Sequence, residues 1–228
     1  MKLRVAVLFA AFSLVACSGG RADAVLPISP SALTVSNTIA FLGDSITAGS
    51  RLPDNPKGIS DPHSQSPTAY PVLVGQSLQV PVVNLGIGGE FIGSAIDQEV
   101  PAVPLNAATV VIYLGTNDVT FGNPNTPIVS DAVAKEQALI AAVQARVPTA
   151  CIALIGLPHD VYAPGMNPYQ DKFDAFLGTL ARPWLDLRSE AWTQDPSNFI
   201  SDGVHPNAQG NNDLAQDVAK LLRDKNCL

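Results

Sequence analysis

Three residues of this chain have the types that perform nucleophilic catalysis together, namely Ser45, Asp202 and His205. A serine hydroxyl is a weak nucleophile, and a histidine held by a carboxylate is the usual base that activates it. Asp202 precedes His205 by three residues, so its carboxylate can reach Nδ1 of the histidine within one loop. Each part also has a structural interpretation, because Ser45 alone is typical of a helix cap and Asp202–His205 alone of a solvated turn.

The run Gly86–Gly89 and Asn117 are candidates for a second part of the same chemistry. Acyl transfer creates a tetrahedral oxyanion, which N–H donors aimed at it stabilise. A backbone N–H of the glycine run and the side-chain amide of Asn117 are suitable donors. The structural alternative is a tight turn followed, further along the chain, by the end of a strand. A dinucleotide site does not fit, because Phe91 stands where the third glycine of that motif would be.

Five short apolar runs predict the strands that position these residues. They lack alternation of apolar and polar residues, as expected for strands buried on both faces of a parallel sheet. These runs are Thr38–Leu42, Val80–Leu85, Ala108–Leu114, Cys151–Ile155 and Trp184–Leu187. The sequence therefore predicts an α/β fold with a doubly wound sheet and right-handed crossovers.

Helical patterns separate the predicted strands. In residues 129–147 valine and isoleucine side chains recur at helical spacing, and Ser130 and Asp131 are suitable starting residues. A second apolar stripe lies near the C-terminus, at Leu214, Val218 and Leu221. In such a fold ligands bind beyond the carboxyl ends of the strands. All the candidate residues follow strands, so we expect them to meet at one edge of the sheet.

Four blocks of sequence, taken together and in this order, resemble the SGNH, or GDSL, hydrolase family. The blocks are Gly43-Asp44-Ser45, Asn84-Leu85-Gly86-Ile87-Gly88-Gly89, Gly115-Thr116-Asn117-Asp118 and Asp202-Gly203-Val204-His205-Pro206. The resemblance spans about residues 38 to 222. It implies a three-layer α/β/α sandwich with a flavodoxin-like, five-stranded parallel sheet, and a serine esterase mechanism without metal or cofactor.

The resemblance also implies a role for each matching residue. Ser45 is expected to be the nucleophile and an oxyanion donor through its own N–H, with Gly89 and Asn117 as the other donors. His205 is expected to be the general base and Asp202 its partner. Gly86 remains an alternative to Gly89, since it is a glycine of the same block.

The substrate is expected to be a carboxylic ester of a small molecule, a lipid or a sugar. The chain looks closest to the branch of thioesterase and lysophospholipase-type enzymes. A carbohydrate O-acetylesterase or an acyltransferase on the same core is an alternative. A binding lipoprotein of the cell envelope that lacks turnover is another, from a different functional class.

The first residues are typical of a bacterial signal peptide. Lys2 and Arg4 precede an apolar stretch over residues 5–15 that is too short for a membrane-spanning helix. The following Cys17 resembles the lipid attachment site of a lipoprotein, and cleavage after Ala24 with plain secretion is the alternative. We therefore expect a signal peptide over residues 1–16, a tether over 17–36 and a hydrolase domain over 37–228, lipid-anchored at the envelope or else secreted or periplasmic.

The composition fits an exported single domain. The chain has 228 residues, of which 46% are hydrophobic and 14% charged, enough to bury a sizeable core. The formal net charge of −7 argues against a nucleic-acid partner. Cys151 and Cys227 can pair outside the cytoplasm, although a buried free Cys151 is equally compatible with the sequence.

Three further polar residues near the predicted site have interpretations of their own. Asp44 and Asp118 are expected to hold their turns by local hydrogen bonds. His159 follows the fourth predicted strand at the same edge, where it could contact substrate.

Overall fold

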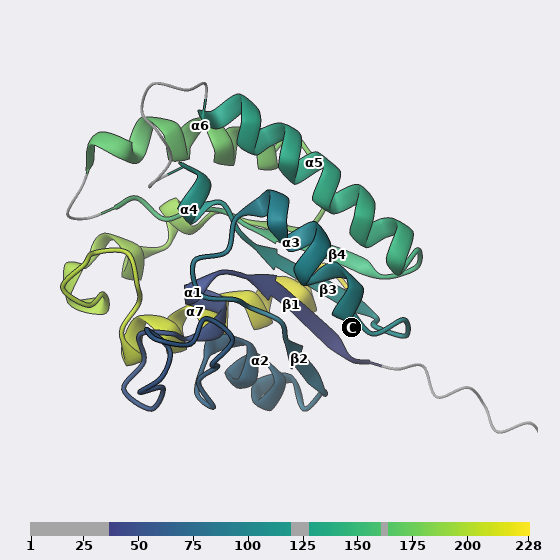
Figure 1. Cartoon of the computed structure of the whole chain (residues 1–228), viewed down its shortest axis with the longest axis horizontal. Helices are drawn as coiled ribbons and strands as arrows, with labels where there is room; N and C mark the ends of the chain where they lie inside the picture. The colour runs from purple at the N-terminus through teal and green to yellow at the C-terminus, as the bar shows by residue number, and fades with distance from the viewer. Residues whose placement is uncertain (1–36, 120–127, 161–163) are drawn as a thin grey trace, which may run out of the picture. The chain divides into compact units, whose positions relative to one another are not determined.

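Five parallel strands form one sheet in the part of the chain that the computed structural model describes, residues 37–119, 128–160 and 164–228 (Figure 1). The strands are β1 (Ile39–Gly43), β2 (Val82–Asn84), β3 (Thr109–Tyr113), β4 (Cys151–Ile155) and β5 (Trp184–Leu185). Their order is β2-β1-β3-β4-β5, and every neighbouring pair is parallel. This order confirms the predicted flavodoxin-like sheet.

Three strands are shorter than the sequence predicts: β3 loses one residue at each end, and local hydrogen bonds explain the larger differences at β2 and β5. The N–H of Val80 donates to the carbonyl of Gly75, so this residue closes the preceding helix and β2 begins later. The side chain of Asp186 accepts the N–H of Arg188 and starts a 3₁₀ turn, which ends β5 at Leu185.

Helices cover both faces of the sheet, which completes the predicted three-layer sandwich (Figure 1). Helices α2 and α7 pack against each other on one face, and α3 packs against α5, which packs against α6, on the other. The α-helices are α1 (Ser45–Ala48), α2 (Tyr70–Leu78), α3 (Ile92–Gln98), α4 (Thr116–Val119), α5 (Ile128–Arg146), α6 (Asn167–Leu177) and α7 (Ala208–Asp224). Short 3₁₀ helices are η1 (Val100–Ala102), η2 (Pro164–Met166), η3 (Leu187–Ser189), η4 (Ala191–Gln194) and η5 (Pro196–Asn198).

Helix α5 begins at Ile128, earlier than predicted, so Ser130 and Asp131 lie in its first turn rather than at its cap. Asp131 pairs with Lys135 at 2.6 Å, one helical turn further on. A carboxylate in the first turn is favourable there, because the helix N-terminus carries partial positive charge. No helix among the described residues is long and apolar enough to cross a membrane.

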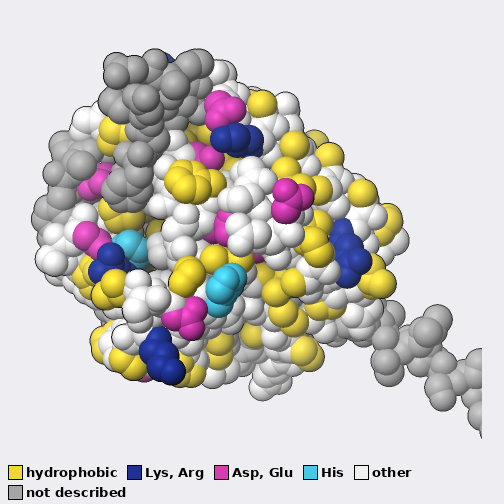
Figure 2. Space-filling view, in the orientation of Figure 1, with side chains coloured by type: hydrophobic (Ala, Val, Ile, Leu, Met, Phe, Trp, Pro, Cys, Tyr) yellow, Lys and Arg dark blue, Asp and Glu magenta, His cyan; other side chains and the backbone are white. Residues whose placement is uncertain are grey.

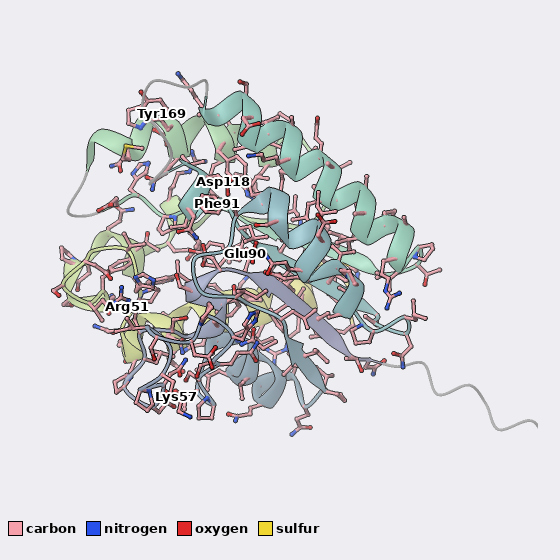
Figure 3. All side chains as sticks on the ribbon, in the orientation of Figure 1. Arg51, Lys57, Glu90, Phe91, Asp118 and Tyr169 are labelled. Carbon is pink, nitrogen blue, oxygen red and sulfur yellow. A yellow bond between two sulfur atoms is a disulfide. The ribbon has the colours of Figure 1, made fainter. Side chains whose placement is uncertain are left out.

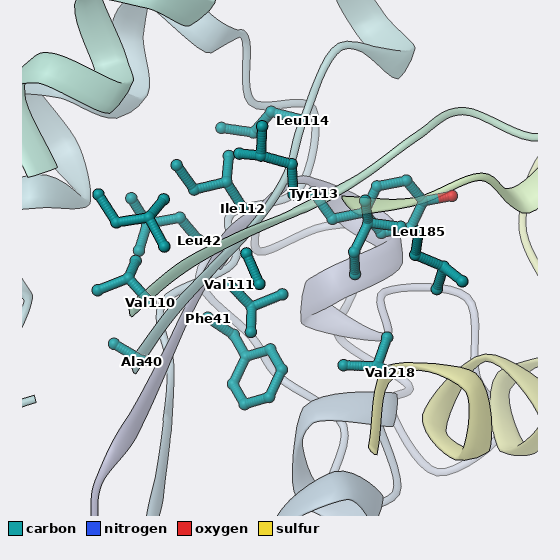
Figure 4. Close-up of a cluster of buried hydrophobic side chains, with 14 of the residues drawn as sticks. Ala40, Phe41, Leu42, Val110, Val111, Ile112, Tyr113, Leu114, Leu185 and Val218 are labelled. Carbon is teal, nitrogen blue, oxygen red and sulfur yellow. The ribbon is translucent and has the colours of Figure 1, made fainter. Parts of the chain in front are cut away.

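The core lies around the two central strands, β1 and β3, whose residues are all buried. Their side chains pack together with Leu185 and Val218, as Figure 4 shows. Tyr70 contacts both Phe41 and Tyr113 edge-on, with ring centroids 5.6 and 6.3 Å apart. Burying one large apolar side chain contributes about 1.5–3 kcal/mol, so this centre holds the ends of β1 and β3 firmly in place.

A disulfide joins Cys151, the first residue of β4, to Cys227 near the C-terminus. This pairing decides between the two states that the sequence leaves open for these cysteines. The carbonyl of Cys227 also accepts a hydrogen bond from the hydroxyl of Thr109 in β3. The end of the chain after α7 is therefore tied to two neighbouring strands.

Candidate active site

Ser45 is the first residue of α1, directly beyond the end of β1. The turn requires glycine at position 43, since a Cβ there would lie 2.0 Å from Oγ1 of Thr47 and 2.7 Å from the carbonyl oxygen of Tyr113. The side chain of Asp44 accepts the N–H of Ile46 at 2.9 Å and caps the helix, as expected for a local bond. Asp44, and not Ser45, is therefore the cap, which leaves the serine hydroxyl for another partner.

A buried carboxyl group, that of Glu99, supports the turn from behind. Its Oε2 accepts the N–H of Gly43 at 2.9 Å, although the two residues are far apart in the sequence. Burial raises the pKa of Glu99 to about 9, so this group is protonated at neutral pH. Burial also raises the pKa of the capping Asp44 to about 6, against the hydrogen bond from Ile46.

His205 and Asp202 meet Ser45 at the same edge of the sheet. Oγ of Ser45 lies 2.8 Å from Nε2 of His205, and Nδ1 of His205 lies 2.8 Å from Oδ2 of Asp202. The loop is closed at its base by a β-bridge between Phe199 and Pro206. The structure thus brings together the three residues that the sequence singles out.

The electrostatics of this pair suit a neutral histidine beside an ionised carboxylate. Burial opposes ionisation of Asp202, but the backbone N–H groups of His205 and Val204, both 3.0 Å from Oδ1, outweigh it and hold the pKa of Asp202 below its ordinary value. For His205, burial lowers the pKa below its ordinary value, against the opposing effect of Asp202. His205 is therefore mostly unprotonated at neutral pH and can accept a proton.

Gly89 and Asn117 lie across from this pair, beside Ser45, in the same groove. The N–H groups of Gly86 and Gly88 already donate to Oδ1 of Asn84 and the carbonyl of Pro62. Gly89 has a φ of +78°, which glycine adopts readily, and its N–H makes no hydrogen bond to a described residue. The side-chain N–H₂ of Asn117 donates one proton to the carbonyl of Glu90 at 2.8 Å, which fixes the amide and leaves its second proton available.

An open groove of about 340 Å³ runs past Ser45, His205, Gly89 and Asn117. On the other side of the nucleophile turn a narrow crevice is lined by Ile46, Leu157, Pro158 and Val204, among others. The site thus has a wide, partly polar side and a narrow, mainly apolar side. A small ester placed on Ser45 can extend into the wide groove, which Ser45 itself lines.

The other polar residues named from the sequence have mixed outcomes. The carboxylate of Asp118 accepts the N–H of Ile92 at 3.0 Å, so its hydrogen bond ties the turn to the start of α3, a distant segment, and not to the neighbouring backbone as the sequence predicts. His159 lines the narrow crevice, where its Nε2 lies 2.9 Å from Asp171, and its contact with substrate stays a prediction. Cys17 lies outside the described residues.

Sequence reasoning missed three contributors to the site, Glu99, Glu90 and Arg51. Glu99 acts on Gly43 and the carbonyl of Glu90 on Asn117 only because the fold brings distant segments together. Arg51 lines the groove beside His205, and nothing in its sequence neighbourhood marks it. A signal was present only for Glu99, as a charged residue directly before the apolar stretch that begins at Val100.

Solved structures with the same fold cover most of this chain. Phospholipase A1 from Streptomyces albidoflavus NA297 superposes with a TM-score of 0.64 at 18% identity, over 83% of this chain and 99% of that chain. Esterase EstA from Pseudoalteromonas sp., inhibited by monoethylphosphonate, gives 0.63 at 20%, over 83% and 98%. The protein TesA gives 0.64 at 23%, over 82% and 98%. At these identities the superpositions establish the fold alone.

No curated protein sequence matches this chain. The model of the GDSL-like lipase/acylhydrolase family, in contrast, matches residues 41–212, a range that contains all four sequence blocks. The match covers well over half of the chain. It agrees with the fold and with the arrangement of residues around Ser45. The chain belongs to the GDSL-like lipase/acylhydrolase family and is a carboxylic ester hydrolase.

Proposed function

We propose that this protein hydrolyses esters through an acyl-enzyme on Ser45, with His205 as general base and Asp202 as its partner. The observation that carries the proposal is the continuous chain of contacts from Ser45 Oγ to His205 and on to Asp202, with both distances at 2.8 Å. An ionised Asp202 holds the proton of His205 on Nδ1, so the lone pair of Nε2 faces the serine hydroxyl. Ser45 can then lose its proton to Nε2 as its Oγ attacks the ester carbonyl.

The attack produces a tetrahedral intermediate whose oxyanion needs donors. We assign these to the N–H of Ser45, the N–H of Gly89 and the free amide proton of Asn117. Among the described residues neither backbone N–H has a partner, whereas the N–H of Gly86 is engaged by Asn84. This difference favours Gly89 over Gly86, because a donor must be uncommitted before substrate binds.

Collapse of the intermediate completes the first half of the reaction. The ester C–O bond breaks, and the protonated His205 gives its proton from Nε2 to the leaving alcohol. Water then enters, His205 removes one of its protons, and the hydroxide adds to the acyl carbon. The second intermediate expels Ser45 Oγ, which takes the proton back from His205, and the carboxylic acid is released.

Replacing the nucleophile tests this mechanism. Ser45→Ala should lower kcat on a short p-nitrophenyl ester by about a thousandfold or more, since no other oxygen takes its place. Ser60→Ala is a matched control, because Ser60 is an exposed serine that only bonds a carbonyl in its own loop. Unchanged activity in Ser45→Ala would show that the assignment is wrong.

The finer substrate preference is a proposal as well. We infer a thioesterase or lysophospholipase-type preference for an acyl chain, supported by the apolar side chains of Ile46, Leu157 and Pro158 close to Ser45. Rates on p-nitrophenyl esters from acetyl to palmitoyl should then rise beyond acetyl. A maximum at acetyl would instead indicate a carbohydrate O-acetylesterase, and acyl transfer to an added sugar would indicate an acyltransferase.

We further propose that the protein is exported and anchored at the bacterial envelope by a lipid on Cys17. The disulfide between Cys151 and Cys227 supports export, because such bonds persist mainly in oxidising compartments. Mass spectrometry of the mature protein should find a lipidated N-terminal Cys17. An unmodified N-terminus after Ala24 would show ordinary secretion instead.

A further inference from the structure

Arg51 carries a positive charge into the groove beside Ser45, and no residue that the structure describes forms an ion pair with it. It lies three residues beyond Ala48, the last residue of α1, and lines the groove together with Ser45 and His205. Its exposed guanidinium makes no hydrogen bond or ion pair with any residue in the described ranges. Lys, Arg, Asp and Glu side chains stand as separate patches on the face of the molecule in Figure 2, and Figure 3 places Arg51 on this face.

The acidic side chains near Arg51 in the sequence, and Asp202 at the site, accept hydrogen bonds from groups other than Arg51. Asp54 accepts the hydroxyls of Ser66 and Thr68, at 2.6 and 2.7 Å. Asp61, further along the same loop, accepts a backbone N–H at 3.0 Å. Asp202 is occupied by His205. Within the described ranges, the charge of Arg51 is therefore left for an external anion.

Ser50 provides a second and independent observation. Its side chain is 3% exposed and lines the same groove, and its hydroxyl has no hydrogen-bond partner among the described residues. The Oγ faces Gly88, where it would lie 3.2 Å from an added Cβ. Buried hydroxyls are normally satisfied, so an unsatisfied one in the wall of a groove indicates that another molecule supplies the partner.

The charge of Arg51 also acts on the catalytic base. It is one of the causes that lower the pKa of His205, after burial, which is the largest. Arg51 and His205 both line the two cavities on this side of Ser45, whereas the narrow crevice is lined by neither. Because His205 must protonate the leaving alcohol, the alcohol portion of a substrate belongs on the side of Arg51.

We propose that Arg51 and Ser50 form a subsite for an acidic group, a carboxylate or a phosphate, on the alcohol portion of the ester. This inference rests on the proposed function, since it takes Ser45 and His205 as the reacting groups. The guanidinium supplies donors in a planar fork that matches both kinds of oxyanion, and the Ser50 hydroxyl supplies one more donor. The crevice beside Ile46 is left for the acyl portion.

Three acetyl esters of similar shape test the subsite. 4-Acetoxybenzoate carries a carboxylate on its alcohol portion, 4-acetoxyphenyl phosphate carries a phosphate, and methyl 4-acetoxybenzoate is neutral. The readout is the kcat/KM of each variant relative to the unmodified protein, which cancels the intrinsic reactivity of each ester. The carboxylate and phosphate arms show which oxyanion the subsite prefers.

Arg51→Gln should lower kcat/KM on the anionic esters by about fivefold more than on the neutral ester, and added salt should weaken the preference of the unmodified protein. Arg51→Lys keeps the charge and should retain most of the preference, and Ser50→Ala should reduce it in the same direction as Arg51→Gln. Lys57→Gln is the matched control, because Lys57 is an exposed cation of the same loop that does not line the groove, and it lies apart from Arg51 in Figure 3.

Equal losses on all three esters in a folded Arg51→Gln variant would overturn the subsite, as would an equal fall of the anionic preference in Lys57→Gln. Thermal unfolding measured by circular dichroism establishes that each variant is folded. A failure of the proposed function is distinguishable, because Ser45→Ala would then keep its activity on the neutral ester whatever Arg51 does.

Discussion

Two carboxyl groups flank the Ser45 turn, and the structure holds them in opposite charge states. Asp202, whose side chain is 36% exposed, accepts two backbone N–H groups and contacts His205, and its pKa lies below the ordinary value. Glu99 is 1% exposed and accepts one backbone N–H, and burial raises its pKa to about 9. Asp202 therefore acts on His205 through its negative charge. Glu99 acts on the Ser45 turn as a neutral group, through its packing and one hydrogen bond to Gly43.

The difference teaches which property of each group the site uses. In the proposed mechanism a charge near His205 fixes the tautomer of the ring and stabilises the cation formed when His205 accepts a proton. At Glu99 a charge would be costly, because the carboxyl is buried behind the turn and accepts only one backbone N–H. The neutral state of Glu99 thus agrees with its burial behind the turn, and the ionised state of Asp202 agrees with its contact to His205 in the loop before α7.

The largest expected effect comes from making the same amide replacement at both positions. Asp202→Asn should lower kcat by about 10²–10⁴-fold, because an amide N–H would compete for Nδ1 and favour the wrong tautomer of His205. Glu99→Gln should keep kcat within about threefold, since its oxygen still accepts the N–H of Gly43. Steady-state rates of the two variants on one short ester give the comparison. A large loss of kcat in Glu99→Gln would contradict a neutral Glu99.

A smaller effect is expected in the dependence of the rate on pH. The proposed mechanism needs unprotonated His205, whose pKa lies below its ordinary value. The value of kcat/KM should therefore stay level as the pH falls through about 7, and then decline by about tenfold per pH unit below the lowered pKa. A decline that begins above neutrality would show that Asp202 outweighs burial at this histidine.

The free energy of unfolding should fall as the pH rises, because of Glu99, whereas the rate falls as the pH drops. The pKa of Glu99 is raised in the folded state, so the unfolded chain loses this proton at lower pH than the folded protein does. The contribution of Glu99 is therefore complete below the ordinary glutamate pKa and falls as the pH rises toward about 9, by at most about 1.4 kcal/mol per pH unit. Glu99→Gln should remove this fall in urea unfolding measured across the range.

Asp44→Asn should give the smallest effect. The pKa of Asp44 is raised only to about 6, and an asparagine oxygen can still accept the N–H of Ile46. The free energy of unfolding should change by less than about 1 kcal/mol at acidic pH, because both side chains are neutral caps there. Urea unfolding at about pH 4 measures it. A loss well above that size would show that the charge of Asp44 is needed in the folded state.

Much of the site could be predicted because parallel strands order it. Ser45, Gly89 and Asn117 follow β1, β2 and β3, and the carboxyl ends of such strands meet at one edge. His205 and Asp202 follow β5 in the order that the family blocks require. The apolar runs place these strands to within a few residues, because continuous burial leaves a strong pattern in the sequence.

The remaining features depend on contacts between distant segments. Glu99 reaches Gly43 from the end of α3, and Glu90 orients Asn117 from the loop before it. The pairing of Cys151 with Cys227 depends on where the segment after α7 lies against β3 and β4. Whether Arg51 has a counter-ion depends on where every nearby carboxylate finds its hydrogen bonds. Spacing along the chain carries no information on these contacts.

The most direct test of the account is a covalent label on the proposed nucleophile. A fluorophosphonate probe reacts with a serine that a neighbouring base activates, and peptide mass spectrometry locates the adduct. We predict a single adduct on Ser45, lost in Ser45→Ala and formed much more slowly in His205→Ala. An unmodified Ser45 in the folded protein, or an adduct on another serine, would contradict the account and would favour a binding protein of the envelope over an enzyme that works through Ser45.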